Sequence, residues 1–315
     1  MNEFQTVLGA ALPVFGTVAA GLVLRKVNWL TEEADQSLLR LNINVLYPSL
    51  ILDSELGNPA LSRWSNLVLA PLVGFATVAC GLLLALAARR LAGLKGARAR
   101  GTFAVTVGIY NYGYVPLPLT LLLFGRGTVG VLFVHNVGVE IGLWTLGVAL
   151  LSGGTPGRDW RKLINAPLMA ISLALILNAL GLSSQLPRVI LTILHWFGQS
   201  AIPMALLLIG AVIADHLHEF HAKSGGRVIA TALVLRLGVL PMLFLLLAKH
   251  LPASIELKRV MVIEAAMPSA VFPIVLSRHY GGDPATALRV VLSTSIAGLI
   301  TIPLWVHFGM KFVGL

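Results

Sequence analysis

Residues 111–118 read Asn-Tyr-Gly-Tyr-Val-Pro-Leu-Pro, and they lie inside an apolar stretch long enough to cross a membrane. A continuous helix tolerates this run poorly, because Pro116 and Pro118 have no amide hydrogen to donate and Gly113 loosens the turn. The backbone is therefore expected to open here and to leave carbonyl and amide groups unpaired. Each such group is costly in lipid, so we expect the break to line a cavity or to be buried in protein. The alternative interpretation is a simple proline kink.

A second break of the same kind is predicted at residues 264–273, which read Glu-Ala-Ala-Met-Pro-Ser-Ala-Val-Phe-Pro. The two breaks belong to a pattern of prolines that recurs along the chain. The separations are 167 − 13 = 154, 203 − 48 = 155 and 273 − 116 = 157 residues for the pairs Pro13 and Pro167, Pro48 and Pro203, and Pro116 and Pro273. This spacing predicts one unit of about 155 residues used twice, with its halves at 1–155 and 156–315.

The composition is that of a membrane protein. Hydrophobic residues make up 57% of the chain and charged residues 11%, with a mean hydropathy of +0.87. A soluble domain carries about 25% charged residues. The net charge of +10 does not indicate nucleic-acid binding, because the Lys and Arg residues sit in short loops between apolar runs. The single Cys80 excludes an intramolecular disulfide and is expected to be a small packing residue.

Ten membrane spans can be placed in an all-α chain, five in each half. Most contain about 20 residues, enough for a helix to cross about 30 Å of hydrocarbon. The predicted spans are 4–24, 36–54, 65–88, 100–124, 127–151, 163–181, 188–213, 228–248, 257–279 and 285–309. An odd number of spans in the first half inverts the second half in the membrane. Inverted repeats with helices interrupted by Gly and Pro are typical of secondary transporters.

The loop charges predict the orientation of the chain. Lys and Arg residues number fourteen in the loops on one side and seven on the other, leaving out Arg40 and Arg236, which fall inside predicted spans. The richer side is expected to face the cytoplasm. Both termini then lie outside the cytoplasm, and the chain is expected to be a multi-pass protein of the inner (plasma) membrane.

Several segments resemble the auxin efflux carrier family, which includes the plant PIN carriers, and the chain looks like a bacterial member. The likeness follows the family's order over essentially the whole chain, and it is carried by residues 12–26, 41–52, 111–118, 165–170, 201–210 and 267–273. The resemblance implies a ten-helix carrier of two inverted five-helix repeats. It also implies a scaffold domain built from helices one, two and five of each repeat, a transport domain built from the crossed helices, and a homodimer.

Family substrates are small organic anions, namely indole-acetic acid in plants and dicarboxylates such as malate or malonate in some bacteria. Ser269 and Ala270 stand where the plant pattern has Asn, so the resemblance leaves the substrate open. Half-helix N-termini at the two breaks carry partial positive charge that suits an anion. The candidate substrate-binding residues are Asn111, Tyr112, Tyr114, Pro116, Ser269, Pro273, Asn44, Tyr47 and Arg236.

Ionisable groups at membrane depth are costly and are therefore functional candidates. Glu140 lies in the fifth span near His135 and Asn136, and Glu264 lies just before the second break. These four residues are the candidates for coupling to a proton or to sodium. The alternatives are buried pairs that serve packing, with Glu264 a structural partner of Arg236.

Other functions are weaker interpretations of the same sequence. Residues 215–221 hold three His, one Asp and one Glu, which suggests a metal site, but a solvated loop is the simpler reading. No nucleotide-binding or hydrolase motif is found, so we expect no cofactor and energy from ion gradients. The alternatives are a bile-acid sodium symporter type of carrier, a membrane sensor with a carrier fold, and an intramembrane enzyme using Glu140, His135 and Glu264.

Overall fold

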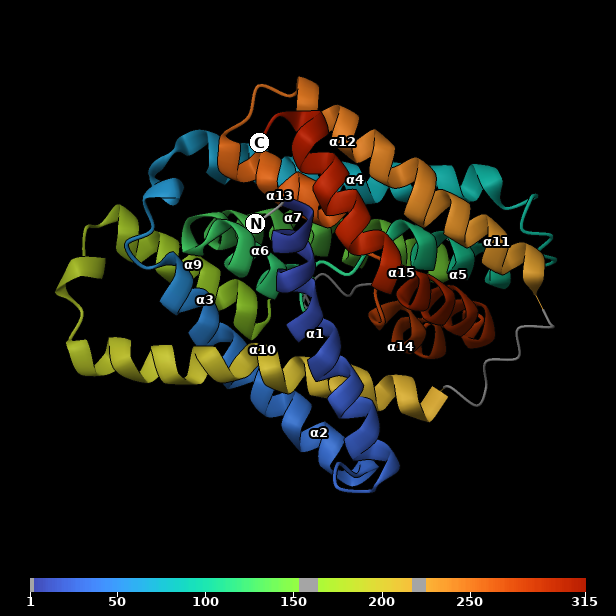
Figure 1. Ribbon diagram of the computed structural model, residues 1–315, viewed down its shortest axis with the longest axis horizontal. Helices are drawn as coiled ribbons and strands as arrows, with labels where there is room; N and C mark the ends of the chain where they lie inside the picture. The colour runs from blue at the N-terminus through green and yellow to red at the C-terminus, as the bar shows by residue number, and fades with distance from the viewer. Residues whose placement is uncertain (1–2, 153–163, 217–224) are drawn as a thin grey trace.

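The computed structural model describes residues 3–152, 164–216 and 225–315. These residues form helices joined by short connections, and the only strand-like pairing among them is a single bridge between Tyr110 and Ser269 (Figure 1). The prediction of an all-α protein is confirmed for the described part of the chain.

The helices follow the order of the predicted spans. In the first half they are α1 (Glu3–Lys26), α2 (Glu32–Leu41), α3 (Tyr47–Glu55), α4 (Trp64–Ala88), α5 (Ala97–Gly108), α6 (Pro116–Phe124), α7 (Arg126–Gly142) and α8 (Val148–Leu151). In the second half they are α9 (Ala166–Ala179), α10 (Arg188–His216), α11 (Gly226–Val234), α12 (Leu240–His250), α13 (Ile255–Ala265), α14 (Phe272–His279) and α15 (Pro284–Val313). Short 3-10 turns occur at Pro59–Ser62 and Ser183–Gln185.

Six helical stretches in the described residues are long and apolar enough to cross a membrane. They are Phe4–Lys26, Trp64–Ala88, Arg126–Leu151, Arg188–Asp215, Gly226–His250 and Pro284–Val313. The remaining predicted spans depart from a plain apolar helix for identifiable reasons. The second begins in the charged, amphipathic α2, the sixth is the shorter α9, and the fourth and ninth are each divided in two.

Three helical stretches of the described residues contain a π-helical turn. The turns are η1 (Asn42–Leu46) between α2 and α3, η3 (Leu143–Gly147) between α7 and α8, and η7 (Leu235–Val239) between α11 and α12. Pro48 follows η1 and Pro241 follows η7 within two residues. A proline has no N–H to donate, and the widened turn rearranges the ladder of backbone hydrogen bonds just before it.

Glycines allow two pairs of helices to approach through their backbones. A Cβ atom at Gly210 of α10 would lie 2.0 Å from the carbonyl oxygen of Val18 in α1, and one at Gly138 of α7 would lie 1.8 Å from that of Pro71 in α4. Small residues at helix contacts are a general feature of membrane proteins, because van der Waals packing drives helix association in lipid. Figure 1 shows α1 crossing α10.

The helices divide into two groups by their packing. The outer group contains α1, α2, α3, α9 and α10, in which α10 packs against α1 and α3, and α3 packs against α9. The inner group contains α4–α8 and α11–α15. The resemblance placed the fifth helix of each repeat with the first two, but α7 packs most extensively against α4, because glycines lie at that crossing.

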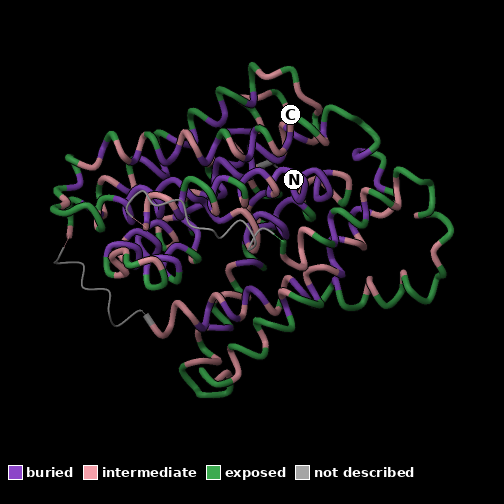
Figure 2. The backbone as a smooth tube through the Cα atoms, turned by 180° about the vertical axis from the view of Figure 1, so that it is seen from behind, coloured by how far each residue is buried: buried purple, intermediate pink, exposed green. Residues whose placement is uncertain are grey.

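Burial follows this division. Figure 2 shows the buried backbone concentrated in the middle of the molecule, whereas α2 and much of α10 are exposed or half-buried. Apolar side chains nevertheless project from the outer face of α9 and α10; they include Met169, Leu173, Ile176, Val189, Ile193 and Trp196. An exposed apolar surface of this extent is expected to face lipid.

Candidate transport site

Two short non-helical segments interrupt the fourth and ninth spans. The first separates α5 from α6 at residues 109–115, and the second separates α13 from α14 at residues 266–271. Pro116 is the first residue of α6 and Pro273 is the second residue of α14. A proline is favoured in the first turn of a helix, because the N–H it lacks has no intrahelical partner there. The sequence therefore starts a new helix at each break.

The two breaks meet in space and pair through their backbones. The amide of Asn111 donates to the carbonyl of Pro268 at 2.8 Å, and the amide of Ala270 donates to the carbonyl of Ile109 at 2.9 Å. These bonds form the antiparallel bridge between Tyr110 and Ser269. The unwound segments thus satisfy part of each other's hydrogen bonding, which a buried backbone requires. We call this region, residues 109–115 and 266–271, the crossing.

Few backbone amides remain free at the starts of the two half-helices. Pro116, Pro118 and Pro273 supply none. The amide of Leu117 is bonded to Gly113, and that of Ile274 is bonded to Val271. The dipoles of α6 and α14 still favour a negative charge near the crossing, but specific hydrogen bonds to a ligand must come mainly from side chains.

Asn111 offers such a side chain. Its backbone is fixed by the bridge, while its side-chain amide makes no hydrogen bond to any residue of the described ranges. Ser269, on the other strand of the bridge, is buried, and its hydroxyl likewise has no hydrogen-bond partner in those ranges. The backbone amide of Ser269 donates to Thr294 of α15 at 3.3 Å.

Tyr112 connects the first break to α7. Its hydroxyl donates to Oε1 of Glu140 at 2.7 Å, and its carbonyl accepts from the side-chain amide of Asn136 at 2.6 Å. The other carboxylate oxygen of Glu140 accepts from the indole N–H of Trp144 at 2.7 Å. His135 is buried beside this group, with Nδ1 at 3.4 Å from Oδ1 of Asn136. The structure thus gathers Glu140 and Asn136 at the crossing.

Tyr47, in the second predicted span, lies against the first break. Its ring centroid lies 6.2 Å from that of Tyr114 and 5.7 Å from that of Phe133. A Cβ at Gly113 would lie 3.5 Å from the Tyr47 hydroxyl. Asn44, in contrast, is exposed, and its side-chain amide donates to the carbonyl of Arg40 in its own helix at 2.9 Å.

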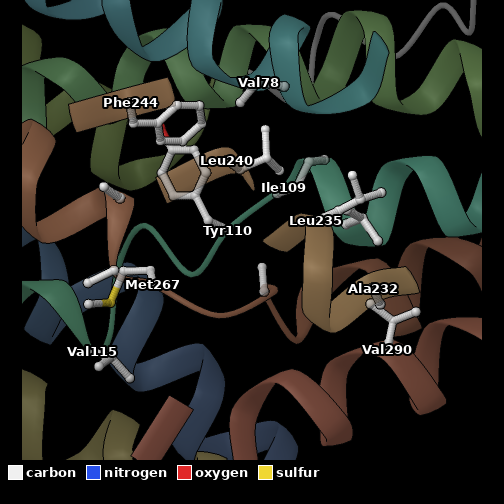
Figure 3. Close-up of a cluster of buried hydrophobic side chains, with 14 of the residues drawn as sticks. Val78, Ile109, Tyr110, Val115, Ala232, Leu235, Leu240, Phe244, Met267 and Val290 are labelled. Atoms are coloured by element: carbon white, nitrogen blue, oxygen red, sulfur yellow. The ribbon is translucent and has the colours of Figure 1, made fainter. Parts of the chain in front are cut away.

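Arg236 and Glu264 are fully buried without a hydrogen-bond partner. None of the three guanidinium nitrogens of Arg236 and neither carboxylate oxygen of Glu264 is bonded within the described ranges. The guanidinium carbon lies 5.2 Å from the ring centroid of Tyr110 and 5.4 Å from that of Phe244. Figure 3 shows these two rings lying together beside the unwound strand of the first break. Aromatic faces attract a cation, and the attraction strengthens when water is excluded.

Sequence reasoning missed Tyr110, Trp144 and Thr294. Tyr110 directly precedes the quoted stretch, and its hydroxyl lies 2.8 Å from that of Thr77 in α4. Trp144 follows Glu140 by four residues, so helical spacing alone placed both on one face. The contact of Thr294 with Ser269 had no sequence signal, because it joins residues of separate helices.

Two clusters of ion pairs join helices near their ends. At one end, Arg25 bridges Asp35 and Asp215. At the other end, Arg126 lies 3.2 Å from Asp53, which also lies 3.1 Å from His195. The first cluster stays within the outer group, whereas the second joins the inner helix α7 to the outer helices α3 and α10.

The suggested metal-binding segment is only partly placed. Residues 217–221 lie outside the described residues, and Asp215 pairs with Arg25 at 3.0 Å. Within the described ranges, no group of three or more His, Cys, Asp or Glu residues is arranged to hold a metal ion.

Comparisons with known proteins identify the family of this chain. The family model described as membrane transport protein matches residues 6–159 and 157–306. An uncharacterized transporter of Methanothermobacter thermautotrophicus is 29% identical over 314 residues, covering 97% of this chain and 98% of that protein. An uncharacterized transporter of Methanocaldococcus jannaschii is 24% identical over 304 residues, covering 95% and 97%. With both halves of its sequence matched, the chain belongs to the membrane transport protein family, as its resemblance to the auxin efflux carriers indicated.

Proposed function

We propose that the protein is a secondary transporter of small organic anions, which bind at the crossing and move by alternating access. The backbone bridge between the two breaks supports this proposal, because it brings together the two segments that carry Asn111, Tyr112 and Ser269. Irregular backbone at membrane depth is typical of substrate sites in transporters. The dipoles of α6 and α14 favour a carboxylate there.

The proposal includes ten spans in two inverted repeats, residues 1–155 and 156–315. The matching order of helices in the two halves supports it, since a divided helix stands fourth in each. We assign the outer group to a scaffold and the inner group, with the crossing, to a moving domain. We also propose that the protein lies in the inner membrane with both termini outside the cytoplasm. We further propose that it forms a homodimer.

A thermal-shift screen of the purified protein tests the substrate class. We expect monocarboxylates or dicarboxylates, added at pH 5.5 and 7.5 with sodium or potassium, to stabilise the wild type. The gain is about 2.7 kcal/mol when ligand is in hundredfold excess over its dissociation constant. The variant Asn111→Ala is expected to fold and to lose this shift, because it removes the free amide and keeps the backbone bridge.

Thr145→Val serves as the matched control for that screen. The Thr145 hydroxyl is exposed and donates only to the carbonyl of Ile141 in its own helix. The control should respond to ligand as the wild type does. A carboxylate shift that survives in Asn111→Ala would contradict the proposed site, and the absence of any carboxylate shift in the wild type would contradict the substrate class.

Arg126 is expected to hold the two helix groups together in the state seen here. Its contacts with Asp53 and His195 join α7 to α3 and α10, so relative movement of the groups must break them. An exposed ion pair contributes about 0.2–1 kcal/mol. We therefore expect Arg126→Gln to shift the population toward the open state by about 1.4- to 5-fold, measured as the labelling rate of Ser269→Cys in a Cys80→Ser background.

The control for Arg126→Gln is Arg63→Gln. Arg63 pairs with Glu256 at 3.1 Å, and its side chain is 58% exposed, against 54% for Arg126. This pair joins α4 to α13 within the inner group, so it does not have to break. Equal labelling rates in Arg126→Gln and the wild type would argue against movement between the two groups at this contact.

A further inference from the structure

Glu140 links the first break to the start of α14 through its two carboxylate oxygens. Oε1 accepts from the hydroxyl of Tyr112 in the first break, and Oε2 accepts from the indole of Trp144. The Trp144 ring packs edge-on against Phe272, with centroids 5.8 Å apart, and Phe272 is the first residue of α14. A change in the state of Glu140 therefore acts on the first break through Tyr112 and on the start of α14 through Trp144.

The hydrogen bonds match the ionised form of Glu140. An ionised carboxylate only accepts hydrogen bonds, whereas the protonated group also carries one O–H donor. The Tyr112 hydroxyl and the Trp144 indole can both donate at these distances, so the arrangement fits two accepting oxygens. A proton that points from either oxygen at its partner gives two donors facing each other, and the contact is kept only if the partner can accept instead.

Only the contact with Tyr112 can reverse. An indole N–H donates and never accepts, whereas a phenol hydroxyl does both. A proton on Oε1 of Glu140 can therefore be donated to the Tyr112 oxygen, while Oε2 keeps its bond from Trp144. The hydroxyl hydrogen of Tyr112 is then released from the carboxylate and can be donated to another acceptor.

No positive side chain offsets the charge of Glu140 within the described ranges. Tyr112, Tyr114 and Tyr47 are the titratable groups that interact with it electrostatically. Among the elements packed against α7, α4, α6 and α9 contain no Asp, Glu, Lys, Arg or His.

No salt bridge joins Glu140 to the charged residues of the other neighbouring helices in the described ranges. Those of α3 and α13 are Asp53, Glu55, Glu256, Lys258, Arg259 and Glu264. Asp53 pairs with Arg126, Glu256 pairs with Arg63, and the Arg259 guanidinium lies 5.2 Å from the ring centroid of Phe124. Glu55 and Glu264 are buried acids without hydrogen-bond partners in the described ranges. A proton is therefore a suitable partner for the Glu140 carboxylate.

We propose that Glu140 is the proton-binding residue of this transporter and that its protonation frees the Tyr112 hydroxyl to donate to a substrate carboxylate. Tyr112 directly follows Asn111, whose side-chain amide has no hydrogen-bond partner in the described ranges, so the first break carries both donors. The anion and the proton then bind together and move together. This inference rests on the proposed function and names its coupling: one proton on Glu140 for each carboxylate held by Tyr112.

The test compares carboxylate binding by the wild type and by Glu140→Gln between pH 5.5 and 7.5. Wild-type affinity should rise as the pH falls, by up to about tenfold per pH unit, because one proton is bound with each anion. In Glu140→Gln the side-chain carbonyl can accept from Trp144 while the amide donates to Tyr112, as in the protonated state. Glu140→Gln should therefore bind at pH 7.5 as tightly as the wild type does at pH 5.5, and a pH gradient should no longer drive its uptake.

Tyr112→Phe provides a second, independent arm. It keeps Glu140 but removes the hydroxyl, so affinity should fall at pH 5.5 and lose its pH dependence. Thr145→Val should keep the wild-type pH profile. The inference is overturned if either Glu140→Gln or Tyr112→Phe binds carboxylates with the wild-type pH profile. That result differs from failure of the proposed function, in which the wild type itself binds no carboxylate.

Discussion

Replacing Arg236 by methionine is expected to lower the free energy of unfolding by about 3–5 kcal/mol, the largest effect of any single side chain considered. Arg236 and Glu264 are both fully buried, lack hydrogen-bond partners in the described ranges and interact electrostatically with each other. Removing the guanidinium leaves the buried carboxyl of Glu264 without its positive neighbour. The change is measured by thermal and denaturant unfolding of the purified protein in detergent.

The double variant Arg236→Met, Glu264→Gln separates charge compensation from lost packing. We expect it to recover most of the stability, because no charge then remains buried alone. Strict additivity of the two single changes would show that the groups are not coupled. Carboxylate binding by a stable double variant would show that Arg236 is a structural counter-charge, whereas loss of binding in that variant would place the guanidinium in contact with the substrate.

The second large effect is expected at the crossing of α4 and α7. A Cβ at Gly138 would lie 1.8 Å from the carbonyl oxygen of Pro71 and 2.8 Å from the amide nitrogen of Phe75, both backbone atoms that cannot turn away. We expect Gly138→Ala to destabilise the protein by about 3 kcal/mol or more, because the helices have to separate. The thermal midpoint and the yield of monodisperse protein measure this loss.

Gly16 supplies a control, because its replacement by alanine is not expected to lower the stability. It lies in α1, and a Cβ added there meets no atom within 4 Å. Alanine is a better helix former than glycine by about 1 kcal/mol, so Gly16→Ala should leave stability unchanged or raise it. If Gly138→Ala were as stable as Gly16→Ala, close backbone contact between α4 and α7 would be ruled out.

The sequence predicted the helical order well, because proline and glycine act locally. Pro116 and Pro273 lie in the first turns of new helices, so both breaks were predicted without knowledge of the fold, although Pro13, Pro71, Pro203 and Pro303 lie inside continuous helices. The hydrophobic runs likewise predicted the ends of the long helices to within a few residues. The predicted second span, 36–54, is part of a longer helical stretch from Glu32 to Glu55, because the charged first turns of α2 carry no hydrophobic signal.

The site was predicted less completely, because its contacts join residues far apart in the sequence. Tyr112 and Glu140 were both candidates, but nothing in their spacing showed a bond between them. Asn44 and Tyr47 were equally plausible on sequence grounds. One turn of helix puts Tyr47 against Tyr114 and leaves Asn44 exposed, and the π-helical turn between α2 and α3 contributes to that rotation.

The backbone bridge at the crossing has a consequence for how the protein is made. Tyr110 and Ser269 are 269 − 110 = 159 residues apart, so the first break leaves the ribosome long before its partner exists. At about 5–20 residues per second, the delay is about 8–30 s. During that time the amide of Asn111 and the carbonyl of Ile109 lack the partners that they have in the finished fold. Until the ninth span is made, these two backbone groups of the fourth span therefore need other hydrogen-bond partners, either water or the insertion machinery.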